Sequence, residues 1–397
     1  MIPPFRSALE VKQGRLVFAA SILYLAASAF GVLKVPGLEL TWANLAFVLL
    51  GIAWLCSSQG TDFRPFFFLA VATALDLLFR TYQFRLEDIG YTANIGKLAV
   101  FSLVVQLLAR LDSSRRSSLA VWFGVFALLS EAFALVYPTL REELYNSQPV
   151  LFDADGSQAG LIAFYRPTGL IGDPNYFAVP LVLMAMALFS ERNYFWFGVA
   201  ALLVAVTGSR SALVALFVPI AAMQLFRART SLSRFSLYLL CYAAVTFLAF
   251  ALNAELRGDT SESNTERAML LRQGLENVMS LSFLQASYGQ ALILGIQGDL
   301  LVVHNTYLQT AVTSALLAAY LIYRTVAGMI LSDNRLILAA LVIEMFFLDV
   351  SSFSSFLFLF ILYSERGRSK RAIQVSHRSS ASTAVEARTA LFAPVVG

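Results

Sequence analysis

Long runs of apolar residues recur along almost the whole chain, separated by short turns that carry charges, glycine or proline. The runs hold about 16 to 20 residues, the length of an α-helix that crosses the hydrocarbon layer of a bilayer. This pattern predicts successive membrane-spanning helices with no separate soluble domain. We expect twelve spans, at 16–33, 41–57, 65–80, 93–109, 118–137, 174–189, 194–207, 211–226, 235–252, 303–323, 335–349 and 351–363.

The composition supports the same fold class. Of 397 residues, 58% are hydrophobic and only 14% are charged, and the mean hydropathy is +0.70, which exceeds what the core of a soluble domain requires. The predicted fold is an all-α, polytopic integral membrane protein with one transmembrane domain over residues 1–363. Residues 364–397 are rich in Ser, Ala and Arg, so we expect a disordered, basic cytoplasmic tail.

The distribution of basic residues predicts the orientation of the spans. If the N-terminus is cytoplasmic, 19 of the 29 Lys and Arg residues fall in the short loops and tails on the cytoplasmic side. This excess follows the positive-inside rule, so both termini are predicted to be cytoplasmic. The formal net charge of +4 therefore reflects membrane orientation and does not indicate a nucleic-acid partner.

Only two of the predicted outer segments are long, 138–173 and 253–302, and both carry candidate functional residues. The first ends in YRPTGLIGDPNYFAVPL, in which prolines and glycines interrupt any regular element. Asp173 followed by Pro174 is typical of a helix start, so the loop is expected to end at the outer mouth of the next span. Arg166 precedes Asp173 by seven residues and should share that region.

The second long segment contains NTERAMLLRQGLENV, which predicts an amphipathic helix on the membrane surface or over a cavity. Arg267 and Arg272 lie off its apolar stripe. The segment leads into LLVVHNTYLQTAV, where His304 is the only histidine outside the predicted tail. The residues of the apolar stripe are Leu270, Leu271, Leu275 and Val278.

The five-residue interruption TGSRS places a charge, Arg210, between two apolar runs. The runs 195–207 and 212–226 hold 13 and 15 residues. At 1.5 Å per residue, each reaches only about 20 Å across a hydrocarbon layer that is about 30 Å thick. The turn is therefore expected to lie below the outer surface, inside the protein, where Arg210 needs a partner.

Several guanidinium groups beside one imidazole on the outer side suit phosphate or pyrophosphate chemistry. Arginine binds such anions through forked hydrogen bonds, and a neutral histidine near its ordinary pKa suits a general base. The sequence thus suggests transfer from a phosphate-bearing lipid, with His304 accepting a hydroxyl proton. Cys56 and Cys241 lie in separate apolar runs, so we expect two buried thiols, no disulfide, no metal and no cofactor.

The ordered motifs RPTGLIGDPNYFA, TGSRSALV, the Arg-bearing loop helix and VHNTYLQ resemble the bacterial O-antigen ligase and O-antigen (exopolysaccharide) polymerase superfamily. The resemblance covers about residues 160–325. It implies a GT-C-like fold in the bacterial inner membrane and metal-independent, inverting glycosyl transfer at the periplasmic face. The donor would be an undecaprenyl-pyrophosphate-linked glycan, and the acceptor a hydroxyl of lipid A core or of another lipid-linked repeat unit.

Carried over by motif, the resemblance implies that Arg210 and one loop arginine hold the pyrophosphate and that His304 activates the acceptor. Arg267 and Arg272 both remain candidates for the loop arginine, and we favour Arg272. The second loop is shorter than is typical of ligases, which slightly favours a polymerase and a chain-length regulator as its partner. Further candidate binding residues are Arg166, Asn175, Tyr176, Asn305 and Lys97.

Simpler roles remain open for most of these residues. Asp173 is expected to cap a helix, and Lys97 could extend toward the head groups instead of the site. Buried carboxylates mark ion pathways, which supports a transporter or flippase of lipid-linked sugar as the alternative function. We interpret most of them as partners of the outer arginines, and a scaffold role would leave those arginines unexplained. The carboxylates concerned are Asp76, Glu131, Glu344 and Asp349.

Overall fold

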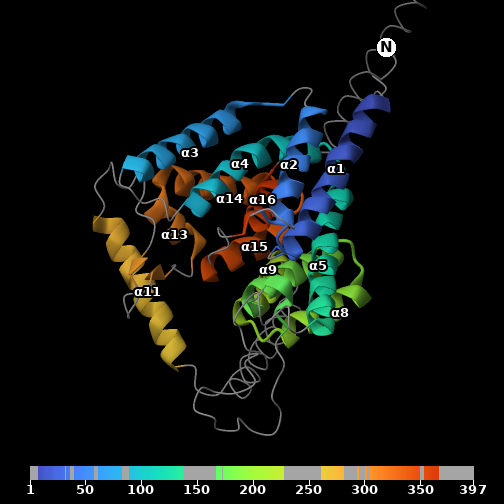
Figure 1. Ribbon diagram of the computed structural model, residues 1–397. Helices are drawn as coiled ribbons and strands as arrows, with labels where there is room; N and C mark the ends of the chain where they lie inside the picture. Colours follow the sequence, from blue (N-terminus) through green and yellow to red (C-terminus); the bar gives the residue numbers. More distant parts are fainter. Residues whose placement is uncertain are drawn as a thin grey trace, which may run out of the picture.

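The computed structural model of the chain is almost entirely helical over the residues that it describes (Figure 1). The exception is a short antiparallel pair, β1 (Ile293–Leu294) with β2 (Leu300–Leu301). This architecture confirms the all-α fold class. The described residues are 8–31, 33–35, 40–57, 61–82, 89–137, 167–171, 173–227, 261–280, 293–294, 300–301, 305–348 and 353–365.

The helices match the predicted apolar runs closely where both are described. Pro174 and Asp173 fix one boundary, since the helix starts at Pro174 with Asp173 as its cap. The predicted span 235–252 and the tail from 366 lie outside the described residues. The helices are α1 (Ala8–Ala29), α2 (Trp42–Leu55), α3 (Arg64–Tyr82), α4 (Ile89–Leu108), α5 (Ser113–Val136), α7 (Pro174–Ser190), α8 (Tyr194–Val206), α9 (Arg210–Arg227), α11 (Ser261–Ser280), α13 (Thr306–Thr313), α14 (Ala315–Leu331), α15 (Arg335–Phe347) and α16 (Ser354–Ser364).

The predicted single span 303–323 is wrong in one respect, because the structure divides it at Ser314. This residue has an extended backbone (φ −161°, ψ 108°) between α13 and α14. Its hydroxyl oxygen accepts a hydrogen bond from the Leu317 N–H and so caps the new helix. The apolar pattern runs on through Ser314, so it predicts the helices but not the break.

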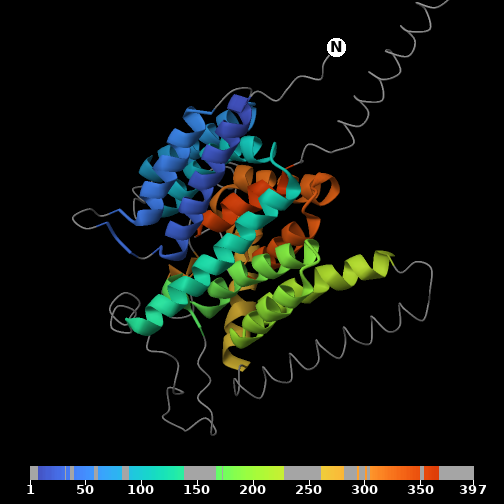
Figure 2. The same cartoon turned by 90° about the vertical axis from the view of Figure 1, so that its right-hand side faces the viewer.

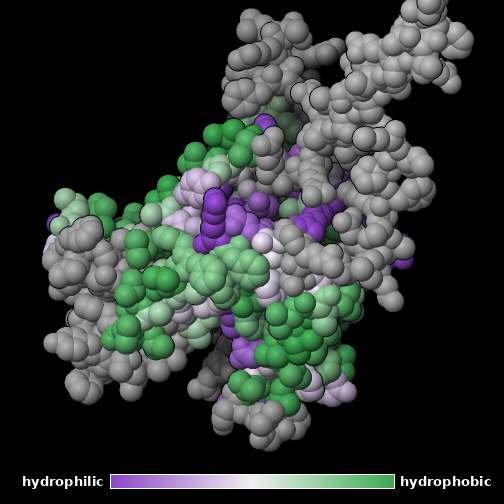
Figure 3. Space-filling model, turned by 90° about the horizontal axis from the view of Figure 1, so that it is seen from above, coloured by the Kyte–Doolittle hydropathy of each residue, from purple (hydrophilic) through white to green (hydrophobic). Residues whose placement is uncertain are grey.

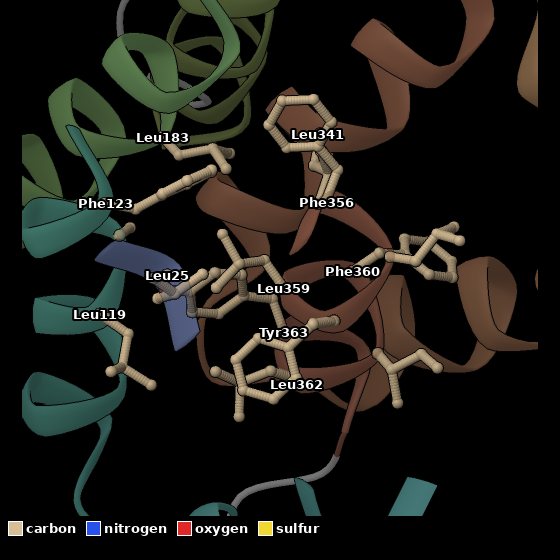
Figure 4. Close-up of a cluster of buried hydrophobic side chains, with 14 of the residues drawn as sticks. Leu25, Leu119, Phe123, Leu183, Leu341, Phe356, Leu359, Phe360, Leu362 and Tyr363 are labelled. Carbon is tan, nitrogen blue, oxygen red and sulfur yellow. The ribbon is translucent and has the colours of Figure 1, made fainter. Parts of the chain in front are cut away.

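The centre of the bundle is α16, which is buried on every side. All residues from Ser355 to Ser364 are buried, because α16 is apolar around its whole circumference and packs against α4, α14 and α15. Figure 4 shows side chains of four other helices that surround it, Leu25, Leu119, Phe123, Leu183 and Leu341.

The outside of the bundle is rich in apolar side chains. Leu78 on α3 is 67% exposed, Phe195 on α8 is 73% exposed and Leu202 on α8 is 67% exposed. Such a perimeter suits lipid better than water. Among the described residues α5 is long and apolar enough to cross a membrane, and eight apolar helices are shorter. The structure is therefore helical with an apolar perimeter, which favours a membrane protein.

The start of α1, the start of α5 and the end of α16 lie at the same end of the bundle. Gly14 on α1 approaches Leu111, just before α5, and the Tyr363 hydroxyl on α16 donates to the Arg116 carbonyl oxygen on α5. Seen from the end where α1 begins, hydrophilic surface gathers near the middle and hydrophobic surface lies around it (Figure 3). A polar face therefore closes this end.

One ion pair at this end leads to a stability prediction. Arg116 is only 1% exposed and donates from Nη2 to Asp333 at 3.1 Å. Removing Asp333 leaves a buried guanidinium without its carboxylate, so Asp333→Ala is expected to destabilise the fold by about 1–3 kcal/mol. The exposed Asp112 makes no side-chain capping bond, so Asp112→Ala is a matched control. Thermal unfolding in detergent measures both, and equal midpoints would contradict the prediction.

The buried-thiol interpretation is wrong for Cys56. Its side chain is free and exposed, because it follows the last residue of α2 at the edge of the bundle. Cys241 lies outside the described residues. Within the described part of the chain, no group of three or more His, Cys, Asp or Glu side chains could hold a metal ion.

Candidate functional site

The loop before α7 is held in place by a buried carboxylate. Glu131 on α5 is 7% exposed and accepts hydrogen bonds from the backbone N–H groups of Thr168, at 3.0 Å, and Gly169. The sequence predicts an outer arginine as the partner of Glu131. Its bonds to backbone N–H groups are a role that the sequence does not predict. The short 3₁₀ turn η2 (Gly169–Ile171) is buried against α5 as a result. Arg166 lies outside the described residues.

Gly169 is the residue that this loop can least replace. Its φ is +55°, and a Cβ would approach the Ser130 hydroxyl at 2.6 Å and the Phe177 ring at 3.0 Å. Gly169→Ala is therefore expected to cost about 1–3 kcal/mol through backbone strain and crowding. Gly51 on α2 has nothing within 4 Å of a Cβ, so Gly51→Ala should be neutral or slightly stabilising. Thermal midpoints test the pair, and an unchanged midpoint for Gly169→Ala would contradict the expectation.

The start of α7 is capped as the sequence predicts. The Asp173 carboxylate accepts from the N–H of Asn175 at 2.6 Å and of Tyr176 at 3.4 Å. The Tyr176 ring lies on Phe353, just before α16, with a centroid separation of 4.7 Å. Asn175 and Tyr176 thus occupy the first turn of α7, and Tyr176 connects it to the centre of the bundle.

The TGSRS turn is buried, as the lengths of its flanking helices predict. Thr207 and Ser209 are both 0% exposed, and Gly208 has a φ of +63° that suits a glycine. The Thr207 hydroxyl donates to the Val204 carbonyl and accepts from the Ser209 N–H. Arg210 begins α9 and is half-buried. The nature of its partner stays a prediction.

The VHN motif is anchored to the end of α15. The Asn305 side-chain N–H donates to the Phe346 carbonyl at 3.1 Å, and the Thr306 hydroxyl donates to the Leu348 carbonyl at 2.7 Å. The Asn305 carbonyl oxygen also caps α13 by accepting from the Leu308 N–H. Asn305 and Thr306 therefore serve as a helix cap and make two bonds to the end of α15. His304 itself lies outside the described residues.

Helix α15 brings these motifs together. It packs against α7 and α9, and its last carbonyl groups hold Asn305 and Thr306. Glu344, one turn before Leu348, is 0% exposed, and Ser211 of the TGSRS motif is its neighbour. The starts of α9 and α13 therefore lie beside the C-terminal part of α15, and the start of α7 lies beside Phe353, which precedes α16.

Glu344 is the least compensated polar group at this meeting point. Ser211 lies beside it, but among the described residues no hydrogen bond of good geometry reaches either carboxyl oxygen, and both oxygens are buried. A buried carboxyl with so few partners is costly, which marks the position as functional or strained. The sequence shows Glu344 as a single acid in an apolar run, but it does not reveal that Ser211 is its neighbour.

Helix α11 in the second long segment packs against α13. Leu270 is 2% exposed and Gly274 is buried, so these two positions form its inner side. Arg272 lies on the opposite side, with its side chain 81% exposed and 2.8 Å from Glu276. The hydrogen bond and the charge of Glu276 raise the pKa of the Arg272 guanidinium. The structure thus places Arg272 in a solvated local ion pair.

Three further predicted features are the apolar stripe of α11, Arg267 and Lys97. The stripe is only partly correct, since Leu271 and Leu275 are exposed while Leu270 is buried. Arg267 belongs to α11, but its side chain lies outside the described part. Lys97 on α4 has its ammonium 5.9 Å from the centre of the Phe47 ring on α2, a cation–π contact.

Comparison with known proteins adds no family. No protein-family model, curated protein or solved structure gives a significant match to this chain.

Proposed function

We propose that this protein is a metal-independent, inverting glycosyltransferase at the periplasmic face of the bacterial inner membrane. It would move a glycan from undecaprenyl pyrophosphate to a sugar hydroxyl. The observation that carries the proposal is that residues of three motifs gather at the end of α15 and just before α16. Ser211 of TGSRS and Asn305 of the VHNT motif, far apart in sequence, contact the last turns of α15, and Tyr176 at the start of α7 packs on Phe353, which precedes α16.

The chemistry of these motifs fits a pyrophosphate leaving group. Arg210 stands at the N-terminal end of α9, where the helix dipole also favours an anion. His304 is the peptide neighbour of Asn305, whose side chain is fixed to α15 and α13. The imidazole would take the acceptor's hydroxyl proton as the acceptor oxygen bonds to the anomeric carbon. The pyrophosphate would leave from the opposite face with the bonding electrons, which inverts the configuration.

We propose twelve spans with both termini cytoplasmic. The grouping of the start of α1, the start of α5 and the end of α16 at one end supports this topology. That end also carries Arg116, Arg335 and, through the bond of its neighbour Glu191 to Ser117, Arg192, in agreement with the positive-inside rule. The meeting point at the end of α15 then faces the periplasm, since Arg335 begins α15 on the cytoplasmic side.

A polymerase is the slightly favoured form of the enzyme, with a lipid-linked repeat unit as acceptor. A ligase would use lipid A core instead. The products in a deletion strain distinguish the two. Loss of a polymerase leaves single repeats on the core, whereas loss of a ligase leaves full-length polymer on its lipid carrier.

The purified protein in proteoliposomes without an ion gradient tests the proposal. Given a lipid-linked glycan donor and either acceptor, it is expected to form a new glycosidic bond. A transporter or flippase is the second candidate, favoured by the poorly compensated carboxyl of Glu344. That function predicts gradient-dependent movement of donor and no new bond. Movement without bond formation for either acceptor would overturn the enzyme proposal.

A further inference from the structure

Helix α11 carries apolar residues on two sides, and α13 covers only one of them. Leu270 and Gly274 are buried on one side of α11, which packs against α13. A second row, spaced one turn apart, points away from the described neighbours, with Leu271 49% exposed, Leu275 54% exposed and Met279 79% exposed. A water-facing helix has no reason to present such a row.

The charged residues of α11 lie on its solvent-exposed side. At about 100° per residue, Leu271, Leu275 and Met279 form one continuous strip beside the buried positions. Arg272 and Glu276 lie beyond the strip and are 81% and 60% exposed, joined in an i,i+4 ion pair. Around the helix, the order is therefore protein contact, exposed apolar strip and charged strip.

We propose that the strip Leu271, Leu275 and Met279 lies in the acyl chains of the outer leaflet, so that α11 is an interfacial helix. The occupant is lipid, because apolar side chains are also exposed around the bundle on α3, α8 and α14. Helix α11 lies at the side of the bundle, toward the end away from the start of α1 (Figures 1 and 2). A helix with one protein-facing side, one apolar side and one charged side suits a membrane surface.

The placement has a consequence for the segment that follows. α11 precedes the chain that leads to Asn305 and α13, and it packs on α13. An outer-leaflet anchor would hold this helix at the depth where a lipid-linked molecule presents its head group. The inference rests on the membrane position proposed above and does not require glycosyl transfer.

Site-directed fluorescence tests the inference in the full-length protein. Cys56 and Cys241 are replaced by serine, and Leu275→Cys is labelled with an environment-sensitive dye in lipid nanodiscs. Nitroxide groups on the lipid acyl chains are expected to quench this dye about twofold or more, while aqueous iodide quenches it little. Arg272→Cys, on the charged strip, is the matched control and is expected to show the reverse.

Two further variants separate the outcomes. Met279→Cys repeats the measurement one turn away, in case Leu275→Cys alters the helix. Leu202→Cys on α8 reports the bundle perimeter. Iodide quenching of Leu275 and Met279 as strong as that of Arg272 would overturn the inference. Protection from both quenchers would also overturn it, since it indicates cover by a second protein copy. If Leu202 escapes lipid quenching as well, the proposed membrane position itself fails.

Discussion

Arg210→Ala and His304→Ala are each expected to reduce glycan transfer by about 10²–10³-fold, with normal insertion into the membrane. Arg210 begins α9 beside the buried TGSRS turn, and Ser211 next to it neighbours Glu344. Loss of the guanidinium would leave the developing charge on pyrophosphate without its main donor. Loss of the imidazole would leave the acceptor hydroxyl without a base. Radiolabelled transfer at matched protein levels measures both variants.

Arg335 supplies the control for Arg210. It starts α15 at the opposite end of the bundle, where its guanidinium donates to the Ser332 and Ile330 carbonyl groups. Arg335→Ala is expected to keep near-normal transfer. Arg210→Lys should resemble Arg210→Ala, because lysine cannot make a forked bond to phosphate. Full activity in Arg210→Ala or His304→Ala would refute the roles proposed for them.

The helices themselves could be predicted because their apolar runs and their caps agree. Asp173 and Pro174 predict a helix start from adjacent residues alone, and α7 starts at Pro174 with Asp173 as its cap. Ser314 shows the limit of predicting helices from the apolar pattern, because a serine within an apolar run is compatible with a continuous helix or with a helix cap. The central place of α16 depends on packing against helices from the whole chain, so no local pattern predicts it.

The candidate site was predictable as motifs but not as an arrangement. Span lengths indicated that the TGSRS turn lies inside the protein, and Thr207 and Ser209 are buried. The role of α15 was hidden, because its main contributions are backbone carbonyl groups at Phe346 and Leu348. Every residue has a carbonyl group, so the sequence does not mark the ones that bind. Glu131 was visible as an acid, whereas its bonds to two backbone N–H groups were not.

The loop arginine can now be chosen from the register of α11. Leu270 and Gly274 define the inner side of this helix. Position 267 precedes Leu270 by three residues and lies on that same side, within about 60° of it. Position 272 lies about 200° around, where Arg272 pairs with Glu276 in solvent. We therefore expect the pyrophosphate partner to be Arg267, which reverses the preference for Arg272 drawn from the sequence.

The two arginines make a matched pair of variants on one helix. Arg267→Ala is expected to lower transfer about 10–100-fold, because it removes charged hydrogen bonds to an anion. Arg272→Ala is expected to stay within about twofold, because an exposed i,i+4 pair contributes little. Both variants are compared in the proteoliposome assay, with donor titrated to separate binding from rate. Since both substitutions remove one guanidinium from α11, any loss through helix stability would appear in both. A loss confined to Arg272→Ala would restore Arg272 as the functional residue and exclude the register argument.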